Sequence, residues 1–428
     1  MSRPFRLVLV AGLVVFAGIS VGAGGARAAS FHVGTQDARA TAMGMAMTAD
    51  VDDASAALYN PAGLAQPSRL ELRLGASMII PTFKETVSGV ETSTQSKVVV
   101  PPTAYLAYSF NDEAAIGVGV FSLFGLEARW PDDWIGRYTS TRSSLRTVYI
   151  NPEIAYRFLG RIRFGAGVQV VRGSVDIRKQ VPVPIAPGVP PIEITSDLEG
   201  VDWGVGGNLG LQIDILEKGS RFGALSFGAT YRSGVTFDFQ DARANFSNVP
   251  APLAANPLLQ DQKVTSKITL PQVLTLGVAW NHGGLRLAVD TEYTGWQTVG
   301  AIDVVFANPA QNTHVVKNYH HTWNLHVGGE YAITPSWLVR LGFMYDPTPS
   351  PSETLSPDLP DADRLNFAGG VGFRAGGFAA DVGYQYVLLL SKDTTFPVRP
   401  GVPGGAPGES VNGGVHVIGL TLGYNLKL

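Results

Sequence analysis

The sequence contains no cysteine among its 428 residues. Disulfide frameworks, zinc–thiolate sites and thiol catalysis are therefore excluded. The formal net charge is only −3, which gives no electrostatic case for a nucleic-acid partner. The seven histidines show no metal-ligand spacing, so we expect neither a metal nor another cofactor.

Long apolar runs are also missing from most of the chain. A membrane-spanning helix needs about 20 consecutive apolar residues, and no such run follows the N-terminal segment. That segment has the features of a signal peptide: Arg3 and Arg6, an apolar core over residues 7–19, and the small-x-small site Ala26-Arg27-Ala28. We therefore expect export through a cleaved signal at residues 1–28, with a mature chain that begins at Ala29.

What the chain does have is alternation of apolar and polar residues. In residues 411–428 one face carries the side chains of Ile418, Leu420, Leu422, Tyr424, Leu426 and Leu428. The other face carries Gly, Thr, Asn and Lys, so one face suits lipid and the other a polar lumen. Only a helix or a closed barrel can satisfy its backbone polar groups in lipid.

About fourteen stretches share this pattern, and the connectors between them alternate between short and long. The stretches are residues 69–81, 98–110, 114–124, 143–158, 161–176, 199–215, 222–237, 266–280, 285–296, 318–332, 337–345, 364–374, 378–390 and 411–428. The pattern predicts an all-β fold: a transmembrane antiparallel β-barrel of about 14 strands over residues 67–428. Short connectors belong at the periplasmic rim and long ones outside the cell.

Residues 29–66 lack the alternation. We expect them to form an N-terminal luminal plug, or hatch. Met43, Met45 and Met47 lie in this segment, and methionine adapts to irregular apolar partners. They are predicted either to pack the hatch against the wall or to contact an acyl chain.

The inward face of the predicted barrel is unusually charged. Strand parity places these residues inside: Arg286, Asp290, Glu292, His326, Glu330, Arg340, Asp381 and Gln385. The opposite register would expose the charges to lipid at a cost of about 2–4 kcal/mol each near the midplane. The charges are predicted to pair and fasten the hatch, or else to hold a carboxylate. Trp280, Trp296, Trp323 and Trp337 lie near strand ends, where aromatic girdles form.

Several motifs go beyond barrel patterning. Asp52-Asp53-Ala54-Ser55 precedes Tyr59-Asn60-Pro61-Ala62-Gly63-Leu64, and Phe121-Ser122-Leu123-Phe124-Gly125-Leu126 precedes Trp134-Ile135-Gly136-Arg137-Tyr138. Pro360-Asp361-Ala362-Asp363-Arg364 lies in the C-terminal third. In this order and spacing the chain resembles the FadL/TodX-type outer-membrane transporters of long-chain fatty acids and other hydrophobic compounds.

The resemblance implies a plugged barrel that captures its substrate in the lumen and releases it sideways through the wall. It implies hatch roles for Asn60, Pro61, Ala62 and Gly63, and a contact between the hatch and Asp363. It also implies a lateral opening at Phe121, Ser122, Phe124 and Gly125. The expected partners are a hydrophobic small molecule, outer-membrane lipid and lipopolysaccharide, and the barrel assembly machinery; we expect a monomer.

Three other functions stay open at this stage. Monoaromatic hydrocarbons make similar demands on an apolar pocket. A general diffusion porin would need an unobstructed lumen, against which the hatch argues. An outer-membrane lipid hydrolase would need a nucleophile beside the outward His416, but Ser391 has inward parity. We therefore expect a protein that is not an enzyme.

Overall fold

The computed structural model describes residues 31–66, 69–95, 97–186, 188–217, 219–398 and 407–427. The predicted signal peptide and its cleavage site lie outside these residues, as do Ala29 and Leu428. Among the residues described, no helix is long and apolar enough to cross a membrane.

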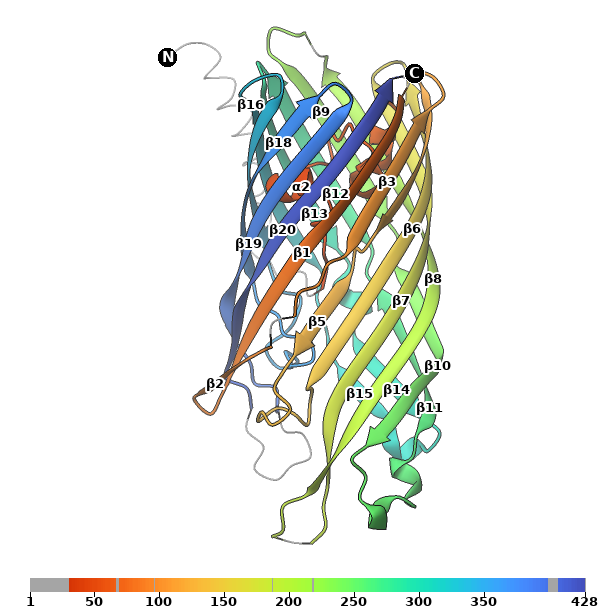
Figure 1. Ribbon diagram of the computed structural model, residues 1–428, viewed down its shortest axis with the longest axis vertical. Coiled ribbons are helices and arrows are strands. Elements are labelled where there is room, and N and C mark those ends of the chain that lie inside the picture. Colours follow the sequence, from red (N-terminus) through yellow and green to blue (C-terminus); the bar gives the residue numbers. More distant parts are fainter. Residues whose placement is uncertain are drawn as a thin grey trace.

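A single antiparallel sheet closes on itself as a barrel of 14 wall strands, which confirms the predicted fold (Figure 1). β1 closes the barrel by pairing with β20 from Arg69 opposite Lys427 to Thr86 opposite Ser410. Each wall strand pairs with the next one, and the last pairs with the first. The wall strands are β1 (Arg69–Val87), β3 (Pro102–Ser109), β4 (Ala114–Phe121), β6 (Arg142–Phe158), β7 (Ile162–Val183), β8 (Ile192–Leu216), β9 (Ala224–Arg232), β12 (Val273–His282), β13 (Leu285–Thr294), β16 (Thr322–Ala332), β17 (Trp337–Asp346), β18 (Arg364–Ala375), β19 (Phe378–Asp393) and β20 (Ser410–Lys427).

Side chains alternate between the lumen and the outside, as expected of a barrel in lipid. On β20 the outward Ile418, Leu420, Leu422, Tyr424 and Leu426 are all exposed, whereas the inward Thr421 is buried. The charged residues predicted to face inward are buried or half-buried. The sheet therefore has the register that keeps charges out of lipid.

The aromatic girdle prediction holds for some tryptophans and is wrong for Trp296. Trp323 and Trp337 are exposed on the outer wall. Trp296 instead lies in η4 (Trp296–Thr298), just beyond the end of β13, and is fully buried. Its ring packs against Phe31 of the hatch, with ring centroids 4.8 Å apart, because the chain leaves the wall at Gly295.

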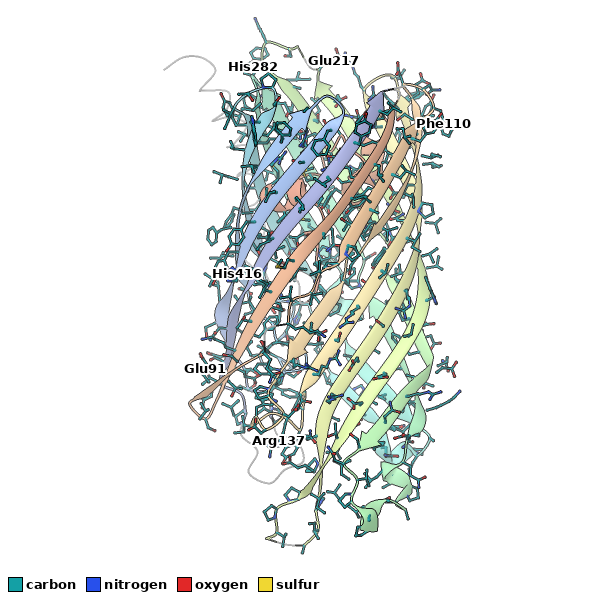
Figure 2. The ribbon with its side chains drawn as sticks, viewed as in Figure 1. Glu91, Phe110, Arg137, Glu217, His282 and His416 are labelled. Atoms are coloured by element: carbon teal, nitrogen blue, oxygen red, sulfur yellow. The ribbon has the colours of Figure 1, made fainter. Side chains whose placement is uncertain are left out.

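Tight turns join the strands at one end of the barrel. His282 pairs with Leu285, so only Gly283 and Gly284 form the turn, and both have positive φ angles of 57° and 83°. Such two-residue turns match the twist of antiparallel strands. Glu217 and His282 mark this end in Figure 2, and Glu91 and Arg137 mark the opposite end.

At the opposite end the long connectors contain strands of their own rather than loops alone. These extend the sheet as β2 (Val90–Ser93), β5 (Gly125–Arg129), β10 (Val235–Ser247), β11 (Gln262–Leu270), β14 (Ala301–Phe306) and β15 (Thr313–Val316). Short turns of 3-10 helix lie among them or beside them, namely η2 (Ala251–Leu253), η3 (Pro257–Leu259) and η5 (Pro309–Gln311). Trp130 stacks on Trp134 in a buried cluster and donates to the Pro357 carbonyl at 2.9 Å, so two long connectors pack together at this end.

The hatch lies inside the barrel and consists of α2 (Ala38–Ala42), α3 (Ala56–Tyr59) and η1 (Pro61–Leu64) (Figure 1). Inward glycines of the wall let its backbone approach closely. A Cβ on Gly228 would lie 2.3 Å from the Thr48 carbonyl oxygen, and one on Gly342 would lie 2.1 Å from the Gly44 nitrogen. These wall positions exclude any side chain larger than hydrogen while the hatch is in place.

Candidate functional site

The third wall strand is interrupted. β4 ends at Phe121, which pairs with Tyr149 of β6, and β5 resumes at Gly125, which pairs with Arg146 of the same strand. Residues 122–124 therefore lie opposite only two residues of β6, Thr147 and Val148. The interrupted strand thus has one extra residue at this point. Such a bulge bends the strand and frees part of its backbone from the ladder.

On its other side the interrupted strand loses its neighbour. β3 pairs with β4 only as far as Ala104 opposite Val120, and β3 begins at Pro102 opposite Ala76 of β1. β1 itself continues to Val87. Beyond Pro102 the wall therefore has no continuous ladder between β1 and β5.

The hatch supplies the hydrogen bonds that the bulge loses. Val33 donates its N–H to the Leu123 carbonyl at 2.7 Å, and Gly125 donates its N–H to the Phe31 carbonyl at 2.9 Å. The Ser122 N–H is bonded by the side-chain oxygen of Gln36 at 3.1 Å. The first residues of the hatch thus form a short strand against the interruption.

A buried aromatic cluster surrounds the same segment. Phe121 stacks on Tyr149 with ring centroids 5.4 Å apart. Phe124 packs edge-on against both Phe31 and Trp296, with 6.0 Å between centroids in each pair. The predicted opening residues Phe121 and Phe124 are therefore buried, whereas Ser122 and Gly125 are half-buried.

A cavity of about 580 Å³ adjoins the interruption. Its lining includes the hatch residues Phe31–Thr35 and Met45, the bulge residues Phe121, Ser122 and Gly125, and luminal side chains of the opposite wall. It also includes Val98, Val100 and Val148, which are exposed on the outside of the barrel. One continuous cavity thus connects the hatch with the outer face of the wall.

The cavity has an apolar part and a polar part. Valine, proline and aromatic side chains line it near the wall, whereas Glu292, Asn324, His326, Asn366 and Gln385 line it on the luminal side. The cations in the lining lie beside carboxylates. Lys97 and Arg146 share the single carboxylate of Glu127, at 3.8 Å and 3.1 Å, and Arg364 bonds Asp361 at 2.6 Å.

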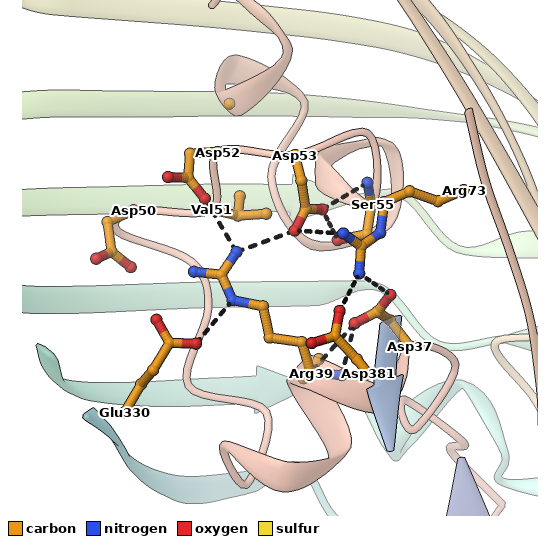
Figure 3. A network of polar contacts seen from close by, with 12 residues as sticks. Asp37, Arg39, Asp50, Val51, Asp52, Asp53, Ser55, Arg73, Glu330 and Asp381 are labelled. Atoms are coloured by element: carbon orange, nitrogen blue, oxygen red, sulfur yellow. Dashed lines mark hydrogen bonds and ion pairs between the residues drawn. The ribbon is translucent and has the colours of Figure 1, made fainter. Parts of the chain in front are cut away.

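Five of the predicted luminal charges belong to the network of ion pairs and hydrogen bonds that fastens the hatch. Some bind hatch residues directly, and the others act through a neighbouring charge of the wall. Asp381 accepts a bond from Arg340 at 2.8 Å. Arg73 binds both Asp381 at 3.1 Å and the hatch residue Asp37 at 3.0 Å (Figure 3). Glu330 joins Arg340 at 2.6 Å to Arg39 of the hatch at 3.4 Å.

The remaining two of these five contact the hatch directly. Arg286 binds Asp50 at 2.6 Å, and Asp290 accepts the backbone N–H groups of Met47 and Thr48 at 2.9 Å each. A further predicted charge, Glu292, pairs with His32 of the hatch at 3.3 Å and also lines the cavity, as does His326.

The electrostatics of the hatch follow from this network. Burial disfavours the charged form of Asp53, but the guanidinium groups of Arg73 and Arg39 outweigh burial and hold the pKa of Asp53 well below its usual value. A buried carboxylate paired in this way stays ionised. The loss of one partner would leave the other buried and unpaired.

Asn60 and Pro61 tie the hatch to a different part of the wall. The Asn60 amide donates to the Thr48 carbonyl at 2.8 Å and to the Leu211 carbonyl of β8 at 3.0 Å, and its oxygen accepts the Ala62 N–H. Pro61 and Ala62 fit over Gly165 of β7, and Gly63 packs against Val51.

Among the described residues, no hydrogen bond or ion pair joins the hatch to Asp363. Asp363 instead accepts the Thr348 N–H at 2.8 Å and the Tyr345 hydroxyl at 3.4 Å. Tyr345 belongs to β17, and Thr348 lies in the connector between β17 and β18. Asn60 is bonded to β8 and β9. The Asp363 carboxylate is satisfied by its own loop, so the structure does not bring it to Asn60.

Two of the three methionines pack the hatch against its surroundings, and the third faces the cavity. Met43 and Met47 are 1% exposed, and Met43 packs against wall Gly328. Met45 lines the cavity.

The sequence analysis missed Gln36 and Thr147, whose side chains accept hydrogen bonds from the backbone of the bulge. It also missed Asn324, although the strand parity that places His326 inside places Asn324 there too.

His416 lies on the outer wall, as predicted, and its Nδ1 is 2.9 Å from the Tyr384 hydroxyl. The inward parity predicted for Ser391 is wrong, because a bulge shifts the register of β19 between Leu389 and Lys392 and leaves Ser391 exposed.

Comparison with known proteins places the chain among membrane transporters. It is 25% identical to a long-chain fatty acid transport protein of Escherichia coli O6:H1, over 78% of this chain and 81% of that one. The crystal structure of a Pseudomonas aeruginosa FadL homologue matches 92% of this chain and 99% of its own, with a TM-score of 0.79 and 20% identity. The Pseudomonas putida toluene transporter TodX matches 92% of this chain and 98% of its own, with a TM-score of 0.71 and 18% identity. A model of the outer membrane protein transport protein family (OMPP1/FadL/TodX) matches residues 19–425, and the chain therefore belongs to this family.

Proposed function

We propose that this outer-membrane protein takes up long-chain fatty acids or similar hydrophobic compounds. In this proposal the compound is captured in the luminal cavity and released sideways through the wall at the β4–β5 interruption. The observation that carries the proposal is the single cavity whose lining includes both the hatch residue Phe31 and the outward-facing Val98, Val100 and Val148.

The route is favoured by elementary thermodynamics. Apolar surface gains free energy when it leaves water for an apolar environment. A molecule that moves from an apolar cavity into the surrounding hydrocarbon keeps that gain, whereas passage along a water-filled lumen would forfeit it. Two relatives carry matching names, one a long-chain fatty acid transport protein and the other a toluene transporter.

The hatch argues against a general diffusion porin, which would need an unobstructed lumen. It fills the lumen with buried residues and is fastened by the Arg73–Asp381 and Arg286–Asp50 pairs. A lipid hydrolase would need a serine beside His416, but among the described residues the hydrogen bond of the His416 ring is with the Tyr384 hydroxyl at 2.9 Å. We infer a transporter without enzymatic activity.

Uptake of a labelled long-chain fatty acid into cells that lack their own outer-membrane fatty-acid transporter tests the proposal. Expression of this chain should restore uptake, and Gly125→Val should lower it by narrowing the opening. Gly329→Val is a matched control, because a Cβ at either glycine meets its nearest neighbour at 3.5 Å and Gly329 lies on a remote strand.

Equal uptake by the two variants at equal surface abundance would refute lateral release. Absence of uptake by the unmodified chain would refute transport of fatty acids, and the same assay with labelled toluene then tests the monoaromatic alternative. Steady high single-channel conductance of the unmodified chain would favour the porin.

A further inference from the structure

Two cations share one carboxylate where the cavity reaches the outer face of the wall. Lys97 Nζ lies 3.8 Å from Glu127 Oε1, and Arg146 Nη2 lies 3.1 Å from Glu127 Oε2. All three residues line the cavity. A single carboxylate balances only one of the two positive charges, so this group carries a net positive charge.

A third cation nearby does not change that balance. Arg142 Nε lies 3.6 Å from Glu127 Oε1, but its Nη1 binds Asp176 at 2.6 Å, so Arg142 has a carboxylate of its own. Glu127 is 4% exposed and accepts a hydrogen bond from the Ser144 hydroxyl at 2.8 Å. The anion of the group is therefore buried and fixed against β6.

The two cations, in contrast, are open to a ligand. The Lys97 and Arg146 side chains are 46% and 54% exposed. Among the described residues, Arg146 donates one side-chain hydrogen bond, to Glu127, and Lys97 lies too far from Glu127 to donate one. An ammonium carries three donors and a guanidinium five, so most of these donors are left for a further acceptor.

Arg146 also marks the limit of the apolar outer wall. On β6 the outward Val148 and Ile150 are exposed, and Arg146 is the next outward residue toward the long connectors. On β7 the exposed Arg172 pairs with Val148 on one side and with the exposed Trp203 of β8 on the other. A charge is costly at the midplane of the bilayer but tolerated near its surface, where tryptophan also gathers. We place Arg146 and Arg172 at the boundary between hydrocarbon and headgroups.

The β4–β5 interruption lies at this same boundary. Gly125 pairs with Arg146, and residues 122–124 lie opposite Thr147 and Val148. β5 lies toward the end of the barrel that carries the long connectors (Figure 1). A compound that leaves the cavity here can place its apolar part in hydrocarbon and its polar part among the headgroups.

We propose that Lys97 and Arg146 bind the carboxylate of a departing fatty acid and hold it at the level of the headgroups while the acyl chain enters the outer leaflet. This inference rests on the proposed function, because it assumes that fatty acids leave the cavity through the wall. The acyl chain then lies along the exposed Val98, Val100 and Val148. Hydrogen bonds between a cation and a carboxylate are stronger than those between neutral groups, so the charged headgroup is favoured over a neutral one.

Binding of two ligands of equal chain length tests the role of the charges. The full-length mature protein is placed in phosphatidylcholine nanodiscs, and equilibrium dialysis at pH 9 measures labelled dodecanoate and dodecanol against nanodiscs without protein. Lys97→Met combined with Arg146→Met should weaken dodecanoate binding about 3- to 20-fold, the range expected for two partly exposed ion pairs. Dodecanol binding should stay unchanged.

Two double variants serve as controls. Arg172→Met with Lys263→Met removes two exposed charges that are not part of the cavity lining and should leave dodecanoate binding unchanged. Lys97→Arg with Arg146→Lys keeps both charges at the site and should also retain binding. Heat-modifiable migration on gels confirms that each variant is folded.

Two photoreactive analogues of dodecanoate test where the carboxylate lies. One analogue carries a diazirine beside the carboxylate, and the other carries it at the methyl end. The first should label Lys97 and residues 142–146 of the unmodified protein more strongly than the second, as mapped by mass spectrometry. Equal or weaker labelling by the first analogue would overturn the inference.

Unchanged dodecanoate binding in the Lys97 and Arg146 variant, or an equal loss in the Arg172 and Lys263 control, would also overturn it and leave the proposed function standing. If that first variant loses only the binding of labelled lipopolysaccharide added to the nanodiscs, the two cations bind lipid phosphate and the inference is wrong. If neither dodecanoate nor dodecanol binds the unmodified protein, the proposed function fails and the inference fails with it. Selective loss of dodecanoate binding, with both controls unaffected, would support the inference.

Discussion

His32 of the hatch lies directly opposite Phe124 of the interrupted wall strand, in an antiparallel bridge. The flanking hydrogen bonds run from Val33 to Leu123 and from Gly125 to Phe31. The N-terminal segment of the hatch thus acts as a partner strand for the bulge. His32 and Gly125 both line the cavity, so this contact borders the proposed route.

A disulfide across this bridge should lock the contact. His32 and Phe124 form a non-hydrogen-bonded pair, in which Cα atoms lie about 4.5 Å apart and disulfide geometry is accessible. We expect His32→Cys with Phe124→Cys to block uptake when oxidised and to recover it with reductant. The chain has no other cysteine, so the crosslink is unambiguous. Each single cysteine variant is the control, and equal uptake in both redox states would show that the contact need not open.

The hatch should be held more firmly at low pH than at high pH. Burial disfavours the charged His32 ring, but the charge of Glu292 and its hydrogen bond outweigh burial and raise the pKa of His32 above 6.5. A raised pKa in the folded state adds stability that is complete below the unfolded value and is lost as the pH rises through the folded value.

Amide hydrogen exchange at Val33 and Gly125 measures this effect. After correction for the intrinsic pH dependence of exchange, protection should fall as the pH rises above the raised pKa of His32. His32→Gln should remove the change, and protection at the remote Asn60 hatch site serves as an internal control. Constant protection in the unmodified chain would show that the pair does not hold the segment.

Removal of the Asp381 charge should loosen the hatch. Asp381→Asn leaves the guanidinium groups of Arg73, Arg340 and Arg374 without their shared carboxylate. Breaking a buried ion pair in this way costs about 3–5 kcal/mol. We expect faster proteolysis within residues 31–66 while the barrel still migrates as a folded species.

Asp241→Asn is the control for that variant, because Asp241 pairs with Lys263 in the open, where its side chain is 83% exposed. Exposed pairs contribute about 0–1 kcal/mol. Equal proteolysis rates in the Asp381 and Asp241 variants would mean that the ion network does not fasten the hatch.

A side chain at Gly228 should displace the hatch from the wall. The Thr48 carbonyl oxygen lies 2.3 Å from an added Cβ, and the contacting atoms are backbone. We expect Gly228→Leu to raise single-channel conductance in planar bilayers. Gly369→Leu should leave conductance low, because its nearest neighbour lies at 3.5 Å. Low conductance in both variants would indicate that the hatch does not obstruct the lumen.

Alternation along the chain was sufficient to predict the barrel. Each of the fourteen predicted stretches overlaps a wall strand, and the inward parity of Arg286, Asp290 and Arg340 is confirmed by their burial. The reason is local: a period of two places every second side chain on the same face, and lipid tolerates only one kind of face. The same reasoning failed at Ser391, because a bulge changes the parity without changing the composition.

Tertiary structure alone decided how the hatch and the wall interact. No period or motif indicates that Gln36 bonds Ser122 or that Phe31 pairs with Gly125, since these contacts join segments about ninety residues apart through unpaired backbone groups. The carboxylate that Lys97 and Arg146 share belongs to the same class, because the two cations and Glu127 come from separate segments of the chain. Sequence determined which side chains face the lumen, and only the closed barrel determined which of them meet.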